Sequence, residues 1–367
     1  MKKNLRYIGI FAVLVLWGAL TVFAWVKPAG ETSEAERRPL AQFPVVSGES
    51  LLSGKFVTDF EAYTLDQFPG RDLFRKLKAL VHYNVLGQKD NNGIYIEDGY
   101  AAKLDYPVNE NGLNHALDRL NFVYETYLKD TGSKVYASVI PDKGYYLAEK
   151  NGYPAMDYEK LFAAVQEKLP FAEFVDITDC LNHTDYYFTD THWRQEKLLP
   201  VAQKLSSALG VTAPKAEDFV QTKLDRPFYG VYYGQAALAM EPEALYILES
   251  DLLQDCMVYD YESQRFSSVY DLEKLSGKDP YDVFLSGPKS LLRIENPNAT
   301  TERELIVFRD SFGSSVTPLL VQDYSMVTLV DIRYLDSRML KNHLEFHGQD
   351  VLFLYSTLVL NSGSTLK

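Results

Sequence analysis

The chain has 367 residues, of which 46% are hydrophobic and 24% charged, a composition typical of a globular protein with a sizeable core. Its net charge of −13 argues against nucleic acid as a partner, because such a surface repels phosphates and no basic stripe offsets it. The two cysteines, Cys180 and Cys256, cannot form a disulfide framework and show no zinc-site spacing, and the sequence leaves open whether they pair.

The N-terminus has the pattern of a membrane segment. A basic stretch, residues 1–6, precedes an uncharged apolar run, 7–26, that is long enough to cross a hydrocarbon core as a helix. The basic flank predicts that residues 1–6 stay in the cytoplasm and that the rest lies outside it, at the cell membrane. A cleaved signal peptide is the alternative, with Val22 and Ala24 before the cut, although Trp25 fits such a site poorly.

The next segments are read in chain order. Residues 27–48 lack a sustained apolar period and are expected to be a linker, and residues 49–367 are expected to form one extracytoplasmic domain. Two amphipathic helices are predicted between Ser53 and Gly87, with a break at Pro69-Gly70. The alternating segment NGIYIEDGYAAKL, residues 92–104, predicts a β-hairpin.

From there on, short apolar runs alternate with helical periods. Strands are predicted at 135–140, 173–177, 304–308, 326–332 and 350–355, and helices at 113–128, 157–169, 193–209, 314–322 and 336–346. This alternation predicts an α/β fold in which helices cover both faces of a parallel, five-stranded sheet. Residues 211–300 lack the alternation and read as an inserted, partly β region.

The catalytic candidates lie where strands end, because open parallel sheets bind ligands at the carboxyl ends of their strands. Ser311 follows the strand 304–308 and precedes a helix, so that the free amides at the helix start would lie beside it and hold an oxyanion. A serine nucleophile needs a base and a carboxylate that orients the base. Asp190 and His192, in the segment YYFTDTHWRQ, supply both groups, and residues two apart in a loop can project to the same side.

Five further residues are candidates for substrate or oxyanion contacts. Lys143 follows the strand 135–140, and Trp193 would wall the site and exclude water. Tyr233 lies in the tyrosine-rich segment YGVYYGQAAL, and Arg309 and Gly313 flank Ser311. Lys143 as a solvated loop lysine and Tyr233 as a structural residue remain alternatives.

Other interpretations of the same residues stay open at this stage. Ser311 or Asp310 would serve equally as the N-cap of the helix that follows, and Asp190 as the cap of the helix 193–209. The histidines and aspartates at 183, 185, 190 and 192 are suitable ligand types for a divalent metal, but they lack helical H-E-x-x-H-like spacing. We expect no metal and no other cofactor.

The sequence also resembles a known family. DTHW at 190–193, followed by RDSFG at 309–313, is similar to motifs of the DHHW family and of the related alginate O-acetyltransferase-like proteins, whose SGNH-hydrolase-like domains place the Asp-x-His element before the serine. The resemblance covers most of residues 37–356 through the segments RRPLAQFP, YTLDQFPGRDLFRKLK, NNGIYIEDGY, VIPDKGYY, YDVFLSGPKSLLRI, LIVFRDSFGSSVTPLLVQDYSMVTLVDIRY and DVLFLY.

This resemblance implies a function as well as a fold. The implied triad is Ser311, His192 and Asp190, and the implied activity is acyl transfer, usually of acetyl, to an extracytoplasmic polysaccharide. A multi-pass membrane acyltransferase is the implied supplier of the acyl group. A carbohydrate esterase with the same triad and a non-catalytic glycan-binding or scaffold protein are the alternatives.

One segment departs from the family pattern. Many relatives carry Gly-Asn or Gly-Asn-His where this chain has Gly287-Pro288-Lys289. If that asparagine contacts the oxyanion or the substrate in relatives, this chain lacks the contact, so the resemblance does not identify the oxyanion donors.

Overall fold

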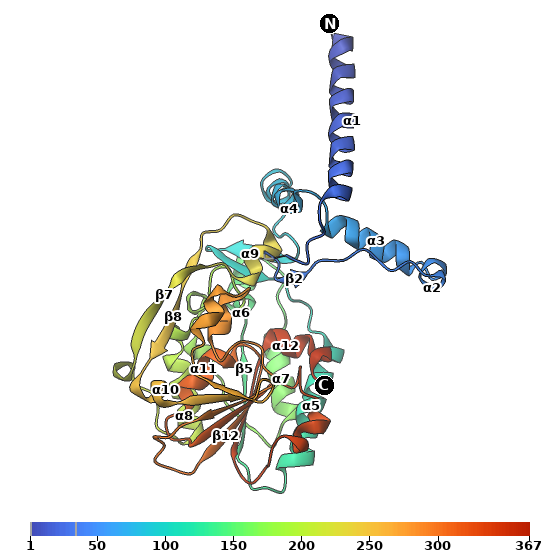
Figure 1. Cartoon of the computed structure of the whole chain (residues 1–367). Helices are drawn as coiled ribbons and strands as arrows, with labels where there is room; N and C mark the ends of the chain where they lie inside the picture. The colour runs from blue at the N-terminus through green and yellow to red at the C-terminus, as the bar shows by residue number, and fades with distance from the viewer. Residues whose placement is uncertain (1, 34) are drawn as a thin grey trace. The chain divides into compact units, whose positions relative to one another are not determined.

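The computed structural model describes residues 2–33 and 35–367, which divide into two compact units. The first unit extends to Asn92 and includes Tyr233–Ala239, whereas the second comprises Gly93–Tyr232 and Met240–Lys367 (Figure 1). The predicted linker 27–48 and the first part of the predicted domain, 49–92, therefore both lie in the first unit.

The N-terminal helix is the most apolar element of the first unit. α1 spans Lys2–Val26, and its segment Tyr7–Val26 is long and apolar enough to cross a membrane, with none of it buried in the protein. A membrane anchor and a signal sequence both satisfy these criteria.

The rest of the first unit is a set of short elements. They are the ribbon strands β1 (Thr32–Ser33) and β2 (Arg38–Pro39) and the helices α2 (Gly48–Leu52), α3 (Lys55–Asp66) and α4 (Arg71–Leu80). The predicted break at Pro69-Gly70 is confirmed, because Gly70 has the left-handed φ of 68° that separates α3 from α4. Arg38 donates two hydrogen bonds to the carboxylate of Asp66, 2.7 and 2.6 Å long, which tie the ribbon to the end of α3.

The second unit is built on an eight-stranded sheet of order β10-β9-β11-β13-β12-β14-β5-β6. Its parallel part consists of β5 (Val135–Ile140), β6 (Glu173–Phe174), β12 (Glu304–Arg309), β13 (Met326–Val330) and β14 (Asp350–Ser356). These are the five predicted strands, and their parallel pairing is confirmed. All of β5 and β14 is buried, which explains why the strands read as continuous apolar runs rather than as alternating ones.

Both faces of this sheet are covered by helices (Figure 1). Val135, Ala137 and Val139 of β5 pack into one hydrophobic cluster with α5 (Glu110–Val123) and α7 (Tyr158–Lys168). Tyr136 and Ile140 point the other way, into a cluster with α8 (Leu199–Leu209) and α11 (Gly313–Val316). The predicted α/β class, a largely parallel sheet flanked by helices on both faces, is confirmed.

The inserted region is partly integrated into the sheet. Its strands β9 (Met257–Asp260), β10 (Arg265–Ser267) and β11 (Leu291–Glu295) extend the sheet in antiparallel fashion beyond β13. The remaining strands form two separate antiparallel pairs, β3 (Ile94–Glu97) with β4 (Tyr100–Lys103) and β7 (Val220–Phe228) with β8 (Glu243–Glu249). The first pair is the predicted hairpin. The remaining helices are short: α6 (Lys143–Leu147), α9 (Val231–Ala236), α10 (Asp251–Asp255) and α12 (Thr357–Asn361).

Several predicted elements differ from the structure. The helix predicted at 314–322 is the short α11 followed by a 3₁₀ segment, Thr317–Leu320. The helix predicted at 193–209 begins only at Leu199, although it ends as predicted at Gly210. The strand predicted at 173–177 is shorter, because Asp176 accepts hydrogen bonds from the amide and hydroxyl of Thr178 and turns the chain. The helix predicted at 336–346 is a 3₁₀ segment, Ser337–Asn342. The two cysteines, Cys180 and Cys256, are not bonded to each other.

Candidate active site

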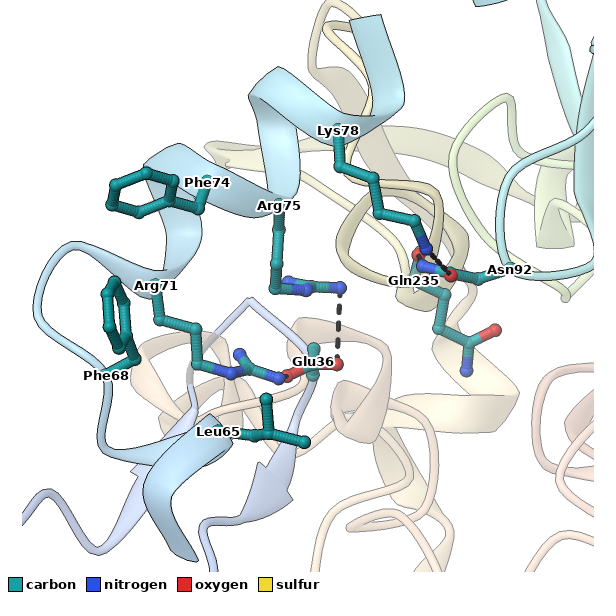
Figure 2. Close-up of a pocket in the computed structure, with 9 residues that line it drawn as sticks. All are labelled: Glu36, Leu65, Phe68, Arg71, Phe74, Arg75, Lys78, Asn92 and Gln235. Carbon is teal, nitrogen blue, oxygen red and sulfur yellow. Dashed lines mark hydrogen bonds and ion pairs between the residues drawn. The ribbon is translucent and has the colours of Figure 1, made fainter. Parts of the chain in front are cut away.

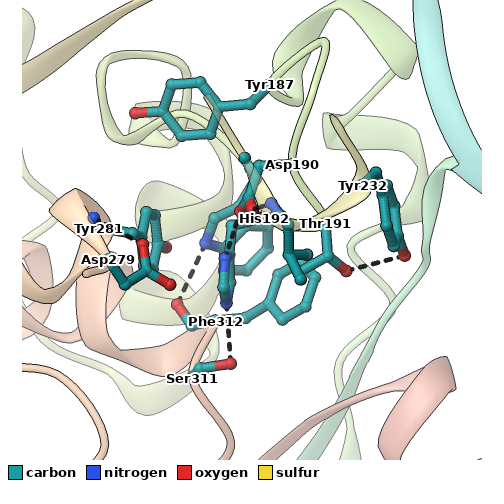
Figure 3. Close-up of polar contacts among 12 residues, drawn as sticks. Tyr187, Asp190, Thr191, His192, Tyr232, Asp279, Tyr281, Ser311 and Phe312 are labelled. Carbon is teal, nitrogen blue, oxygen red and sulfur yellow. Dashed lines mark hydrogen bonds and ion pairs between the residues drawn. The ribbon is translucent and has the colours of Figure 1, made fainter. Parts of the chain in front are cut away.

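The structure brings the two motifs of the second unit together. Ser311 follows β12 at the carboxyl end of the parallel strands, and His192 lies in the loop between Tyr186 and Trp193, whose ends pair in a β-bridge. The Nε2 atom of His192 is 2.8 Å from Ser311 Oγ, and its Nδ1 atom is 2.6 Å from Asp190 Oδ2 (Figure 3). The three groups are therefore linked in the order hydroxyl, imidazole, carboxylate that nucleophilic serine chemistry requires.

Both carboxylate oxygens of Asp190 accept hydrogen bonds that fix the side chain. The side chain is fully buried, and its Oδ2 also accepts the backbone N–H of His192 at 3.1 Å. Its Oδ1 accepts the N–H of Val231 at 2.7 Å. A carboxylate fixed in this way keeps the Nδ1–H of His192 as donor and leaves Nε2 to accept the Ser311 proton.

A glycine makes room for this carboxylate. A Cβ atom added at Gly230 would lie 2.2 Å from the Cβ of Asp190, closer than side-chain carbons approach one another. The backbone of Gly230 therefore passes directly over Asp190, which allows the next residue, Val231, to donate to it. No sequence motif indicated this position.

Aromatic rings fix the plane of the imidazole. His192 stacks on Tyr281 with ring centroids 3.9 Å apart and an interplanar angle of 8°, and it also contacts Phe312. The hydroxyl of Tyr281 donates to Ser315 Oγ at 2.8 Å. Burial raises the pKa of Tyr281 well above its ordinary value, so this hydroxyl remains a donor. Tyr281 lies far from both motifs in the sequence and was not predicted.

The Lys143 side chain holds the carbonyl groups of the loop that carries His192. Its side chain is only 2% exposed, and Nζ donates to the carbonyl oxygens of Tyr187 at 2.8 Å and Asp190 at 2.7 Å. Burial lowers the pKa of Lys143 to about 7, although the charge of Asp190 opposes the shift. A neutral amine has two N–H groups, one for each carbonyl. This geometry favours a positioning role for Lys143 over the predicted substrate contact.

Glu243 of β8 holds the same loop from its other edge. Its carboxylate accepts the N–H groups of Phe188 at 2.8 Å and Thr189 at 2.9 Å, as well as the Thr189 hydroxyl at 3.0 Å. Burial raises the pKa of Glu243, and these hydrogen bonds oppose the rise. No sequence pattern pointed to Glu243, because nothing in its local pattern distinguishes it from other acidic residues in strands.

Trp193 connects the loop to the serine turn. It is fully buried, and its Nε1 donates to the Phe312 carbonyl at 3.1 Å and to Ser315 Oγ at 2.9 Å. The side chain therefore lies behind the site and joins its two halves, instead of walling the site as predicted. Trp193 also pairs with Tyr186 in a β-bridge and a 3₁₀ turn follows at Gln195–Lys197, so α8 begins only at Leu199.

Arg309 and Gly313 shape the turn around Ser311. The guanidinium of Arg309 is fully buried, donates to the Asp310 carbonyl at 3.3 Å and lies 3.9 Å from Asp331 Oδ2. A Cβ at Gly313 would lie 2.6 Å from the Cβ of Arg309, so the turn closes tightly over the arginine stem. Burial of both residues favours support of the turn over the predicted contact with substrate.

The amides of the turn are mostly occupied. The N–H of Phe312 donates to Asp310 Oδ1 at 3.0 Å, and the N–H of Gly313 donates to the Asp310 carbonyl at 3.1 Å. Asp310 thus closes the turn before α11, but it is not the N-cap that the alternative interpretation assigned to Asp310 or Ser311, because the N-cap residue is Phe312 and has no side-chain cap bond. Among the described residues, the N–H of Ser311 has no hydrogen-bond acceptor, which makes it the candidate oxyanion donor in this turn.

The remaining sequence candidates lie elsewhere. Tyr233 belongs to the first unit, whereas its neighbour Tyr232 belongs to the second and donates to Thr191 Oγ1 at 3.1 Å. Lys289, in the segment Gly287-Pro288-Lys289 that differs from the family pattern, forms a salt bridge with Asp260, 2.8 Å long. Asp185 accepts the N–H of Asn182, and no group of three or more His, Cys, Asp or Glu in residues 2–33 and 35–367 is placed to hold a metal ion. The geometry thus gives no support to the metal interpretation.

Comparison with known proteins agrees with these motifs. Residues 173–330 match the family model described as DHHW protein. The resemblance to the DHHW family is confirmed. The crystal structure of a DHHW family protein from Eubacterium siraeum is 23% identical, with a TM-score of 0.61, and the match covers 75% of this chain and 94% of that one. Bacillus cereus PatB1, solved with a sulfonyl adduct, is 18% identical, with a TM-score of 0.59, over 73% and 95% of the two chains.

These two likenesses are likenesses of fold. Both span nearly the whole of the other protein and about three quarters of this chain. A search of curated proteins gave no match. The chain therefore shares the DHHW-type parallel sheet, and its chemistry is argued from its own residues.

Proposed function

We propose that this protein is an O-acyltransferase that carries an acyl group, usually acetyl, on Ser311. The observation that carries the proposal is the position of the His192 imidazole, 2.8 Å from the hydroxyl of Ser311 and 2.6 Å from the carboxylate of Asp190. The DHHW resemblance, which implies acyl transfer, adds support. No cofactor enters the reaction.

In the first half of the reaction, Ser311 Oγ attacks the carbonyl carbon of an acyl donor while its proton moves to His192 Nε2. The tetrahedral intermediate places its negative oxygen near the Ser311 N–H. When the intermediate collapses, the bond from the acyl carbon to the leaving oxygen breaks, and His192 returns the proton to the leaving group. The product is an ester on Ser311, and Asp190 stabilises the transient imidazolium.

In the second half, an acceptor hydroxyl takes the place of the leaving group. His192 Nε2 removes the proton of that hydroxyl, whose oxygen attacks the ester carbonyl carbon. The second intermediate collapses with Ser311 Oγ as the leaving atom, and His192 protonates it. The net reaction moves the acyl group from donor to acceptor and leaves the enzyme unchanged.

The acceptor and the supplier of the acyl group follow from the family resemblance. We propose that the acceptor is an extracytoplasmic polysaccharide, with a multi-pass membrane acyltransferase delivering the acyl group. In this proposal α1 is an uncleaved single-pass anchor, with residues 1–6 cytoplasmic and residues 27–367 outside. Its apolar segment Tyr7–Val26 has the length and composition that the anchor needs.

A carbohydrate esterase is the second candidate function, and one observation favours it. Ser311 is only partly buried, so water can compete with a sugar hydroxyl for the acyl-enzyme. The triad itself serves both outcomes, because the same base activates either nucleophile.

The experiment uses the full chain in detergent with a chromogenic acetyl ester and an oligosaccharide acceptor. Release of the chromophore reports acylation, and mass spectrometry separates acetylated oligosaccharide from free acetate. Ser314→Ala is the matched control, because Ser314 is a buried serine of α11, the helix that follows Ser311, and lies outside the triad. Acetyl transfer supports the transferase, acetate alone supports the esterase, and absence of any acylation in the folded wild type would favour a non-catalytic glycan-binding or scaffold protein.

A further inference from the structure

Helix α4 packs with its charged face inward. Arg71 and Arg75 both reach the carboxylate of Glu36, with closest N–O distances of 2.5 and 3.2 Å, and Lys78 donates to Asn92 Oδ1 at 3.2 Å (Figure 2). Residues 71, 75 and 78 follow the three-and-four spacing of one helical face. This charged face points toward the rest of the first unit.

The opposite face of α4 is apolar and exposed. Leu73, Leu77 and Leu80 repeat at the same spacing and are 69%, 53% and 53% exposed. Phe74, 46% exposed, lies at the edge of this face, where its ring packs edge-on against Phe68. A surface helix of a soluble protein has the reverse arrangement, with apolar residues inward and charges in water. We call Leu73, Leu77 and Leu80 the α4 outer face.

Exposure of this face to water is unfavourable. A contiguous row of large apolar side chains on one side of a helix differs from the single apolar residues scattered over ordinary protein surfaces. The inward bonds of Arg71 and Arg75 fix the rotation of the helix, so the outer face cannot turn into the core without breaking them. The face therefore needs a partner outside the first unit.

The bilayer fits this face best. The same unit contains α1, whose apolar segment is long enough to span a membrane, and the chain from 27 to 70 tethers α4 to it. Lys76, which is exposed and lies between Leu73 and Leu77 in the sequence, adds positive charge that anionic headgroups attract. Apolar residues on one side with basic residues beside them are the pattern of a helix that lies in the membrane interface.

We propose that the outer face of α4 inserts into the headgroup and acyl boundary of the bilayer that α1 crosses. The chain then has two membrane contacts, one spanning and one interfacial. This inference rests on the proposed role of α1 as an anchor, and it is independent of the chemistry proposed for Ser311.

The test places an environment-sensitive fluorophore on the outer face of the full chain. Leu77→Cys is labelled in a Cys180→Ser background, because Cys256 is buried, and the protein is reconstituted into vesicles of phosphatidylcholine and phosphatidylglycerol. Gln166→Cys, exposed on α7, is the matched control. At position 77 we expect a blue shift of emission, quenching by spin-labelled lipid and protection from aqueous iodide. At position 166 we expect that iodide still quenches the fluorophore. Leu80→Cys repeats the measurement if the first substitution disturbs folding.

Three results would overturn the interfacial contact. Equal iodide quenching at 77 and 166 would show a water-exposed face. If the fluorophore is protected from iodide but is not quenched by spin-labelled lipid, and this protection is lost when the protein is diluted in lipid, a second copy of the chain covers the face. Flotation with the vesicles reports anchoring by α1 separately, and failure to float would overturn the anchor and this inference together. Ester reactivity of the same sample reports Ser311, so the two proposals fail independently.

Discussion

Replacement of Lys143 by methionine is the most informative test of how the loop is held. Methionine keeps most of the length of the side chain but cannot donate, so the carbonyls of Tyr187 and Asp190 lose their donors at 2.8 and 2.7 Å. Each buried acceptor left unpaired costs about 1–3 kcal/mol. Methionine has no amine that must lose its water when it is buried, and this offsets part of the loss. We therefore expect Lys143→Met to lower the free energy of unfolding by about 2–4 kcal/mol at high pH.

The effect should depend on pH in a known direction. The folded pKa of Lys143, about 7, lies below the ordinary value of 10.5, so between these values the unfolded chain binds more protons than the folded one. The free energy of unfolding of the wild type therefore rises with pH across this window, by on the order of 4 kcal/mol from this group. The variant lacks this rise, because methionine does not titrate.

The assay is urea unfolding of both proteins in detergent at several pH values between about 7 and 10. The difference between wild type and Lys143→Met cancels the titration of the tyrosines, and it should grow as the pH rises. Lys168→Met, at an exposed lysine of α7, should change the free energy of unfolding by less than about 0.5 kcal/mol at every pH. A difference that is constant with pH would refute a buried, neutral Lys143.

Three further predictions concern the triad, its packing and the topology. Ser311→Ala and His192→Ala should each remove nearly all acyl transfer, measured by chromophore release, and Asp190→Ala should leave somewhat more activity. Because triad members act as a unit, double variants should lose little more than the single variants, and additive losses would contradict this prediction. Gly230→Ala should lower both activity and melting temperature, because its Cβ would lie 2.2 Å from that of Asp190, and an unchanged melting temperature would show that the approach is not tight. Protease added to intact cells should digest residues 27–367 while a cytoplasmic marker survives; protection of these residues, or a soluble mature protein starting near Trp25, would count against the anchor.

The sequence predicted the sheet well because its strands are buried on both sides. Continuous apolar runs such as 304–308 leave little choice of structure, and their alternation with helical periods predicts parallel pairing. The start of α8 could not be predicted, because Trp193 and Gln195 are held by partners distant in the chain. Trp193 bonds to Phe312 and Ser315, more than a hundred residues away in the chain.

For the site, the sequence indicated the reacting groups but not the residues that hold them in position. Ser311, His192 and Asp190 stand in motifs whose residue types suggest their chemistry. Tyr281 and Glu243 act only through packing and loop geometry, which local sequence does not encode. Lys143 was noticed for its place after a strand, yet its burial, which decides its role, is a property of the fold.

The most direct measurement of the central claim is the site of acylation. The full chain is treated with the chromogenic acetyl ester, quenched in acid and digested with trypsin, and the peptide of residues 310–333 is sequenced by mass spectrometry. The account predicts one acetyl group on Ser311 in the wild type and in Ser314→Ala, and none in His192→Ala. Acetylation at another residue, or labelling of Ser311 that persists without His192, would contradict it.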